Sequence, residues 1–168
     1  VRYWGVPGTP EYMHRIGGLE KDRFTGVISS NPENHQYMVD TRQKKMEKIA
    51  DFIPEQEVLG DKEADTLIVG WGGTHGHLLE AMLHLQDSGK KVAYAHFKYI
   101  LPLPKNTYEL LTSYKKVIVA EQNNGQFAGY LGTKFHDLSN IIKYNRIEGQ
   151  PFKVSELVKE FSKIMEEK

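Results

Sequence analysis

A carboxylate followed by a run of amides ends one apolar segment of the chain and is the strongest candidate for chemistry. Glu121 follows the apolar run 117–120, and the polar run 122–126 (QNNGQ) comes next. In α/β folds, the carboxyl end of a buried strand is where ligands bind, so a shielded carboxylate there could act as a general acid or base. It could also accept hydrogen bonds from backbone N–H groups of the next turn. The pattern favours this structural role without excluding the catalytic one.

A glycine-rich turn at residues 70–76 (GWGGTHG) is the second candidate. Glycines let backbone N–H groups point at one anion where a helix begins, so the turn could hold a phosphate. However, its glycines do not match the spacing of a dinucleotide-binding motif, and it lacks the lysine of a Walker-type loop. We therefore favour a tight strand-to-helix turn in which Trp71 packs.

Three histidines in and after this turn could suggest a metal site. On a helix, the side chains of His75 and His77 point about 200° apart, and His77 and His84 lie about 10 Å from each other. Bonds of about 2.1 Å to one ion cannot bridge either pair. We expect a polar or capping role for His75, and we expect His77 and His84 to face solvent.

Composition disfavours several other functions. The chain has no cysteine, which excludes disulfides, iron–sulfur ligation and cysteine nucleophiles within its 168 residues. Its 22 basic and 22 acidic residues balance, so nucleic acid is not expected as a partner. We interpret the basic cluster of Arg42, Lys44, Lys45 and Lys48 as a solvated helix face. Neither a Ser-His-Asp arrangement nor a productive carboxylate pair can be assembled.

No membrane association is expected from the hydropathy pattern. No apolar run approaches the about 20 residues that span a bilayer, and no leader-like segment opens the chain. A cytoplasmic location is the expectation. The first residue is Val1 rather than methionine, which suggests a piece of a longer polypeptide or a processed product.

Alternating apolar segments and amphipathic segments predict the elements that would position these candidates. We expect an open, mostly parallel sheet with helices on both faces, because strands and helices alternate along the chain. Ser88-Gly89, Asn106 and Ser155 are the expected helix caps. The expected strands are 65–71, 92–97, 116–121 and 140–145, and the expected helices are 75–87, 107–113, 125–137 and 156–166.

Residues 1–60 differ from the rest and are predicted to form a connector arm before an α/β domain at 61–168. Their apolar residues are scattered, and turn signals interrupt them. One helix is expected near 32–52, capped by Asn31, with Pro32 in the first turn, where a missing N–H costs nothing. Its intermittent apolar stripe consists of Tyr37, Met38, Met46, Ile49 and Phe52.

Several motifs, in the same order and at the same spacing, resemble one family. The runs 17–20 (GGLE), 34–38 (NHQYM) and 41–45 (TRQKK) are similar to the connector of alpha subunits of 2-oxoacid:ferredoxin oxidoreductases. The runs 69–74 (VGWGGT), 101–104 (LPLP) and 119–126 (VAEQNNGQ) resemble the domain that follows that connector. The likeness is greatest to the 2-oxoglutarate type.

The resemblance implies a transketolase carboxyl-terminal-like domain in an enzyme that converts a 2-oxoacid and coenzyme A to an acyl-CoA and CO₂. That enzyme uses thiamine diphosphate, Mg²⁺, coenzyme A and ferredoxin, and its beta subunit holds the diphosphate and Mg²⁺. The family's activating carboxylate lies upstream of the matched region, so no catalytic, cofactor-binding or metal residue transfers to this chain, and the fragment alone should be inactive.

The resemblance does imply a set of candidate residues that would line a crevice or contact another subunit. The partners expected from the resemblance are the beta subunit, the remaining alpha-subunit domains and, through the whole enzyme, ferredoxin. A free-standing protein-interaction domain and a small-molecule-binding α/β domain are the alternatives. The candidate residues are His35, Arg42, Gly72, Gly73, Thr74, Glu121, Asn123 and Gly125.

Overall fold

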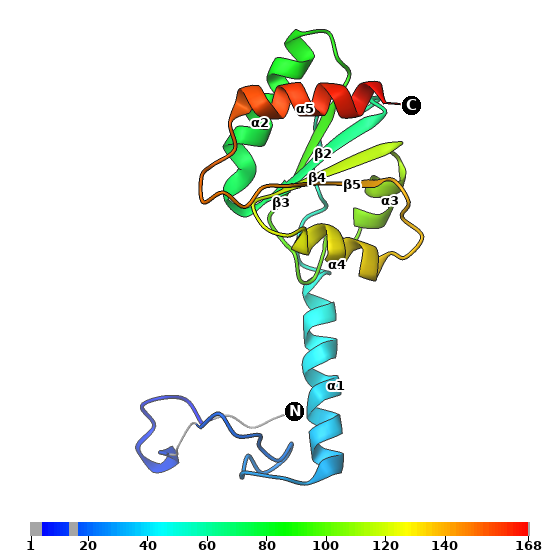
Figure 1. Cartoon of the computed structure of the whole chain (residues 1–168). Coiled ribbons are helices and arrows are strands. Elements are labelled where there is room, and N and C mark those ends of the chain that lie inside the picture. Colours follow the sequence, from blue (N-terminus) through cyan, green and yellow to red (C-terminus); the bar gives the residue numbers. More distant parts are fainter. Residues whose placement is uncertain (1–4, 14–16, 168) are drawn as a thin grey trace. The chain divides into compact units, whose positions relative to one another are not determined.

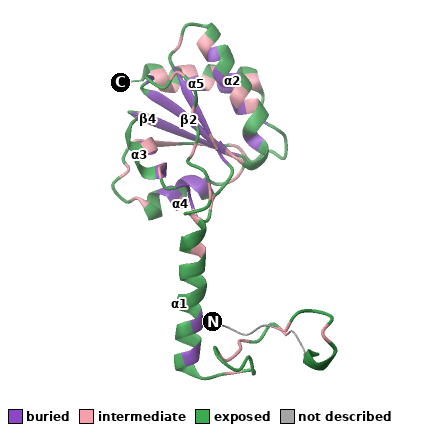
Figure 2. Ribbon diagram, turned by 180° about the vertical axis from the view of Figure 1, so that it is seen from behind, coloured by how far each residue is buried: buried purple, intermediate pink, exposed green. Residues whose placement is uncertain are grey.

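The computed structural model describes residues 5–13 and 17–167, and the chain divides into two compact units, Val1–Asp51 and Phe52–Lys168. The second unit contains a sheet with helices on both of its faces (Figure 1). Buried residues concentrate in the strands and on the inner sides of the helices of this unit (Figure 2).

Five strands form one sheet in the order β1-β3-β2-β4-β5. Four of them are parallel. The short β1, at the edge of the sheet, pairs antiparallel with β3, and the sequence did not predict it. The expected open, mostly parallel sheet is confirmed. The strands are β1 (Leu59–Gly60), β2 (Thr66–Trp71), β3 (Ala93–Phe97), β4 (Lys116–Glu121) and β5 (Ile141–Asn145).

Helices cover both faces because successive strand residues point to opposite sides. On β2, Leu67 and Val69 pack into one hydrophobic core, and Ile68 packs into the other. The first core includes residues of α3 (Thr107–Thr112) and α4 (Gln126–Lys134). The second includes residues of α2 (His75–Asp87) and α5 (Val154–Glu166), and a short 3₁₀ helix, η2 (Gly72–Thr74), leads into α2.

Two expected helix starts differ in their caps. The helix α5 begins at Val154 with Lys153 in the N-cap position, so the predicted cap at Ser155 is wrong. Asn106 does occupy the N-cap position of α3, but its side chain makes no capping bond. Its amide instead pairs with the backbone of Gln56, accepting from N–H at 2.8 Å and donating to the carbonyl at 3.1 Å. The expected carboxyl cap of α2 at Ser88-Gly89 is confirmed, with Gly89 at a φ of +83°.

Two helices end earlier than their patterns indicated. The helix α4 stops at Lys134 because Phe135 leaves helical geometry and packs on the ring of Tyr108, with centroids 5.3 Å apart. The first helix of the chain, α1 (Pro32–Ile49), stops short of residue 52. Its last turn tightens, since the N–H of Ala50 bonds to the carbonyl of Glu47 rather than one residue further back.

The first unit is built around the amino end of α1. Asn31 caps the helix as expected, because its side chain accepts from the N–H of Asn34 at 2.8 Å. Asn34 is buried and ties the preceding loop to the helix: it accepts from the N–H of Arg23 and donates to the carbonyl of Lys21. The only other buried residue of α1 is Met38. Of the predicted apolar stripe, Met38 alone is buried, whereas Tyr37, Ile49 and Phe52 are exposed.

Large apolar side chains are common on the surface of the first unit. Val27, Phe24 and Leu19 are each more than 60% exposed. Among the described helices, none is both long enough and apolar enough to cross a membrane. A further short 3₁₀ helix, η1 (Pro10–Tyr12), lies in the amino-terminal segment.

Candidate functional site

The carboxylate of Glu121, at the end of β4, is fully buried and accepts three hydrogen bonds. Its Oε1 accepts from the indole N–H of Trp71 at 3.1 Å and from the backbone N–H of Phe127 at 2.8 Å. Its Oε2 accepts from the N–H of Ala128 at 3.0 Å. Two of these donors belong to the first turn of α4, where a helix leaves its N–H groups unpaired. The expected hydrogen bonds from backbone N–H groups of the next turn to Glu121 are confirmed.

These bonds join two loops that are far apart in the sequence. Trp71 ends β2 and starts the glycine-rich turn, and its ring packs on that of Phe127 with centroids 6.2 Å apart. Glu121 thus fixes the turn after β2 against the start of α4. The glycine-rich turn itself forms η2 and runs into α2, which is the tight turn that we favoured over a phosphate cradle.

Four of the candidate residues line one small hollow between these loops. The hollow has a volume of about 180 Å³ and is lined by these four residues, Gly72, Gly73, Thr74 and Asn123, together with Trp71 and Gln122. Typical ligand pockets measure about 300–1,000 Å³. The polar side chains are engaged in holding the turns, since Thr74 Oγ1 donates to the carbonyl of Trp71 at 2.9 Å. The hollow is smaller than a typical ligand pocket, and hydrogen bonds hold the loops that form it.

Asn123 and Gly125 shape the start of α4. The side-chain oxygen of Asn123 accepts from the N–H groups of Gly125 and Gln126, at 2.8 and 2.9 Å. Gly125 has a φ of +82°, which favours glycine, and a Cβ there would lie 2.8 Å from Nδ2 of Asn145. Its role is to let the chain turn close to β5.

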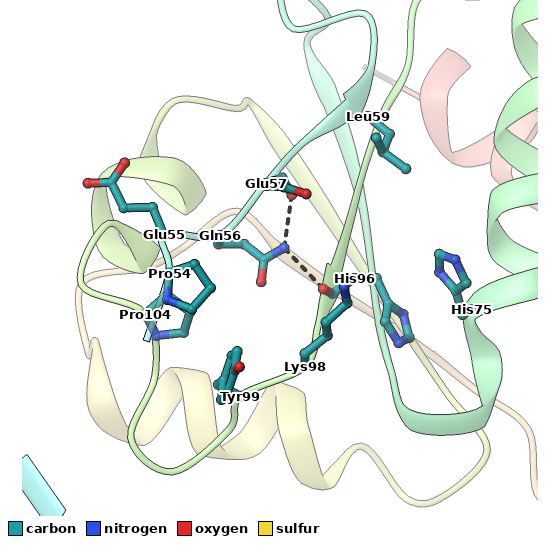
Figure 3. A pocket seen from close by; sticks show the side chains of 10 residues that line it. All are labelled: Pro54, Glu55, Gln56, Glu57, Leu59, His75, His96, Lys98, Tyr99 and Pro104. Atoms are coloured by element: carbon teal, nitrogen blue, oxygen red, sulfur yellow. Dashed lines mark hydrogen bonds between the residues drawn. The ribbon is translucent and has the colours of Figure 1, made fainter. Parts of the chain in front are cut away.

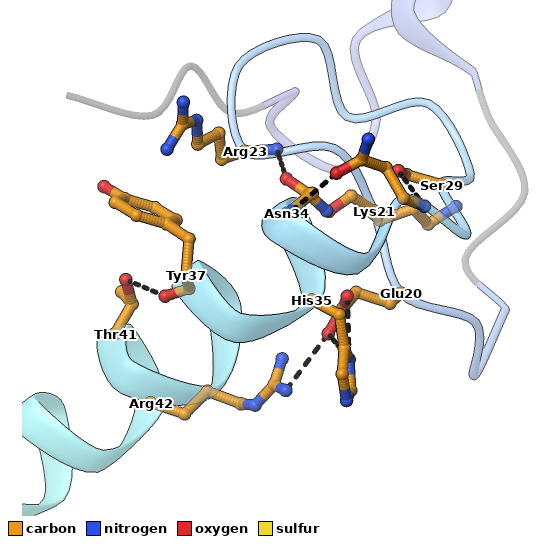
Figure 4. A network of polar contacts seen from close by, with 10 residues as sticks. Glu20, Lys21, Arg23, Ser29, Asn34, His35, Tyr37, Thr41 and Arg42 are labelled. Carbon is orange, nitrogen blue, oxygen red and sulfur yellow. Dashed lines mark hydrogen bonds and ion pairs between the residues drawn. The ribbon is translucent and has the colours of Figure 1, made fainter.

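The other two candidates, His35 and Arg42, belong to the first unit and meet on one carboxylate (Figure 4). Nδ1 of His35 lies 3.1 Å from Oε1 of Glu20, and Nη2 of Arg42 lies 3.1 Å from Oε2. Burial opposes ionisation of Glu20, but hydrogen bonds from Arg42 and His35 outweigh it and lower the pKa of this carboxyl group. Arg42 and His35 thus hold the loop before α1 to the helix. The structure describes this pair within one unit and the remaining six candidates within the other.

The histidines near the glycine-rich turn behave differently from one another. His75 has the expected polar role, but its partner is the hydroxyl of Tyr94, 3.1 Å from Nδ1, and the N-cap position belongs to Thr74. His84 is exposed as expected and lies 3.3 Å from the carboxylate of Glu80. His77 is half-buried, contrary to the expectation. Among the described residues, no group of three potential ligands could hold a metal ion.

Sequence reasoning missed a larger cavity of about 490 Å³ beside the carboxyl end of β3 (Figure 3). His75 and His96 line one side of it, with their ring centroids 4.6 Å apart. The opposite side is formed by the segment before β1 and by Pro104. The sequence offered little sign of this cavity. Its prediction requires knowing that β2 and β3 are neighbours, with Gly70 opposite His96.

Comparison with known proteins identifies the family of this domain. Residues 64–157 match the family model for pyruvate:ferredoxin oxidoreductase core domain II. The chain is 40% identical over 160 residues to 2-oxoglutarate oxidoreductase subunit KorA of Mycobacterium tuberculosis, covering 94% of this chain and 24% of that protein. It is 33% identical over 160 residues to the alpha subunit of 2-oxoacid:ferredoxin oxidoreductase 2 of Aeropyrum pernix, covering 91% of this chain and 25% of that protein.

A solved structure extends this likeness to the fold. The 2-oxoglutarate:ferredoxin oxidoreductase from Magnetococcus marinus, solved with 2-oxoglutarate, coenzyme A and succinyl-CoA bound, matches 96% of this chain and 28% of its own chain. The TM-score is 0.82 at 33% identity. The chain thus spans about a quarter of the length of the curated relatives that it matches. The resemblance to alpha subunits of 2-oxoacid:ferredoxin oxidoreductases is confirmed, and the chain belongs to the pyruvate:ferredoxin oxidoreductase core domain II family.

Proposed function

We propose that this chain is the supporting domain of the alpha subunit of a thiamine-diphosphate-dependent 2-oxoglutarate:ferredoxin oxidoreductase. In this proposal the assembled enzyme converts 2-oxoglutarate and coenzyme A to succinyl-CoA and CO₂ and passes electrons to ferredoxin. The observation that carries it is the 40% identity to a 2-oxoglutarate oxidoreductase subunit over 94% of the chain. The likeness to the 2-oxoglutarate enzyme from Magnetococcus marinus supports the same substrate.

The chemistry of the described residues favours a supporting role over a catalytic one. Glu121, the buried carboxylate at the end of β4, has both oxygens engaged by three N–H donors. A thiamine diphosphate site needs oxygen ligands for Mg²⁺, and the described residues contain no group of three acidic or histidine side chains that could hold a metal ion. We assign the binding of thiamine diphosphate to other parts of the enzyme.

The first unit supports a role in assembly. Its exposed side chains include Phe24, Leu19 and Val27, which would be costly to leave in water unless another surface covers them. The side chains of His35 and Arg42 are also more than half exposed while they hold Glu20. We assign this surface to contact with the beta subunit or with the remaining alpha-subunit domains, in the cytoplasm.

The test is reconstitution of the enzyme from separate parts. The chain is mixed with the beta subunit and the remaining alpha-subunit domains, followed by size-exclusion chromatography and an assay of coenzyme A-dependent ferredoxin reduction. We expect co-elution and activity with 2-oxoglutarate from the mixture, and no activity from the chain alone. Failure to co-elute, or turnover by the isolated chain, would contradict the proposal. Activity with pyruvate and none with 2-oxoglutarate would contradict the substrate assignment alone.

A further inference from the structure

A second place in the α/β unit combines a cavity with basic groups that have no acidic partner. It is the cavity of about 490 Å³ beside the carboxyl end of β3, whose size is in the range of about 300–1,000 Å³ typical of small-molecule sites. All of its lining residues belong to the second unit. The proposed function does not use this cavity.

The wall of the cavity is held in place by hydrogen bonds. Gln56 lies at its centre, and its side-chain amide donates to the carbonyls of Glu57 and His96, at 2.8 and 3.1 Å (Figure 3). The backbone of Gln56 is paired on both sides with the amide of Asn106. The segment before β1 is therefore fastened to both β3 and α3, so the cavity exists before any ligand arrives.

Two imidazoles on one side of the cavity are oriented by a buried phenol. The hydroxyl of Tyr94 lies 3.1 Å from Nδ1 of His75 and 2.8 Å from Nδ1 of His96. Burial raises the pKa of Tyr94, so its hydroxyl stays protonated and can donate to one ring while accepting from the other. Both rings use Nδ1 in this way. The Nε2 of His75 has no partner among the described residues and is available to a ligand.

The electrostatics at this end of the cavity favour an anion. Burial lowers the pKa of His96, and the nearby charges of His75 and Lys98 lower it further, while a hydrogen bond to the backbone of Gly72 acts in the opposite direction. No carboxylate appears among the groups that act on His96. Lys98 forms no ion pair with any described residue. His75, His96 and Lys98 therefore lie together at this end of the cavity, and the groups that act on His96 include no carboxylate.

The remaining lining residues fit the body of an organic molecule. Pro54 and Pro104 lie on the side of the cavity opposite the two imidazoles (Figure 3). Leu59 and Tyr99 add apolar and aromatic surface. The other titratable groups around the cavity are Glu55 and Glu57, which are exposed on the segment before β1 and belong to its rim.

We propose that this cavity binds a small organic anion, a carboxylate or phosphate carried on an apolar or aromatic body. The anionic group lies between His75, His96 and Lys98, and the body lies against Pro54, Leu59, Tyr99 and Pro104.

The proposal is tested with three probes on the full chain: benzoate, phenyl phosphate and the neutral benzamide. Binding is followed by calorimetry and by the ring resonances of His75 and His96. We expect both anions to bind at least about tenfold more tightly than benzamide. The tighter anion identifies the charged group of the natural ligand. The absence of ring shifts at about 10 mM of either anion, or equal binding of benzamide, would overturn the proposal.

A charge variant separates this site from general attraction to the surface. The exposed Lys98 can be replaced without disturbing the core, and Lys98→Ala should weaken binding of the anions about tenfold while leaving benzamide unchanged. Lys91→Ala is the matched control, because it removes an exposed lysine just before the opposite end of β3. Equal losses in both variants, or no loss in Lys98→Ala, would also overturn the proposal.

Discussion

Two glutamates, one in each unit of the chain, are held in opposite ways. Glu121 is fully buried and accepts from neutral N–H groups of a helix start and an indole. The side chain of Glu20 is 17% exposed and lies between Arg42 and His35, which are 55% and 67% exposed. Water cannot reach buried N–H donors that have lost their acceptor, whereas it can hydrate the groups left by a broken ion pair at the surface. The two units should therefore respond very differently to the loss of a carboxylate.

The same contrast distinguishes the two units as wholes. The α/β unit buries both faces of its sheet under its own helices, so its stability comes from within. The first unit buries only Asn34 and Met38 of α1 and leaves large apolar side chains in solvent. A segment with so little core of its own is suited to packing against another surface, which is the assembly role that we propose for it.

The largest effect is expected from Glu121→Ala. Two buried backbone N–H groups and the partly buried indole of Trp71 would lose their acceptor and a cavity would open, which should lower the free energy of unfolding of the α/β unit by about 3–5 kcal/mol. Urea denaturation followed by tryptophan fluorescence measures this loss. Glu63→Ala, which removes an exposed carboxylate from the same unit, serves as control and should change stability by less than about 0.5 kcal/mol. Equal stability of the two variants would mean that the buried bonds contribute little.

Gly125→Ala should have the next largest effect. The residue has a φ of +82°, and the new Cβ would lie 2.8 Å from Nδ2 of Asn145, so we expect a loss of about 1–3 kcal/mol in unfolding free energy. Gly129→Ala in the same helix has open space around its Cβ and should be neutral or stabilising by up to about 1 kcal/mol. Thermal unfolding of both variants compares them, and a destabilised Gly129→Ala with an unaffected Gly125→Ala would refute the assignment.

A smaller effect, confined to the first unit, is expected from Asn31→Ala. The loss of the cap at the start of α1 should cost about 1 kcal/mol and reduce the helical signal of α1. Hydrogen exchange of the α1 amides provides the measurement. Ser155→Ala is the matched control, because Ser155 makes no capping bond in α5 and should exchange like the unmodified chain. Faster exchange in α5 of that control would restore Ser155 as a cap.

The smallest expected effect is the loss of stability of the first unit at acidic pH. The pKa of Glu20 is lowered in the folded chain, so the contribution of this carboxylate is present above its unfolded pKa of about 4.3 and is lost as the pH falls through the folded value. Amide shifts around Glu20 should therefore change under acidic conditions, and Glu20→Gln should remove that acidic change. A transition at neutral pH that survives the substitution would point to another group.

The sheet could be predicted from the sequence because its signals are local. Apolar runs at 66–71 and 116–121 followed by turns are sufficient to define parallel strands, and Asn31 is a local cap. The edge strand β1 could not be predicted, since two residues carry no periodicity and pair only because β3 lies beside them. The cap at Asn106 was misjudged for a similar reason: its amide is taken by Gln56, a residue 50 positions away.

The candidate site was predictable only in part. The carboxylate of Glu121 and the turn at 72–74 are marked by composition, and the parallel register of β2 and β4 brings them together. The role of the carboxylate was open, because the donor Trp71 comes from another strand and Phe127 and Ala128 come from the next helix. The cavity beside His75 and His96 depends on the order of the strands, and no motif in the sequence records that order.

The most direct test of the account is the turnover of the reconstituted enzyme carrying Glu121→Gln, measured per assembled complex together with the unfolding free energy of the chain. The account predicts that the variant chain is less stable by about 2–3 kcal/mol, because an amide N–H₂ replaces one acceptor, and that kcat changes by less than about twofold. Unchanged stability with a fall in kcat of about a hundredfold or more would contradict it, since Glu121 would then be acting on the substrate rather than holding the fold.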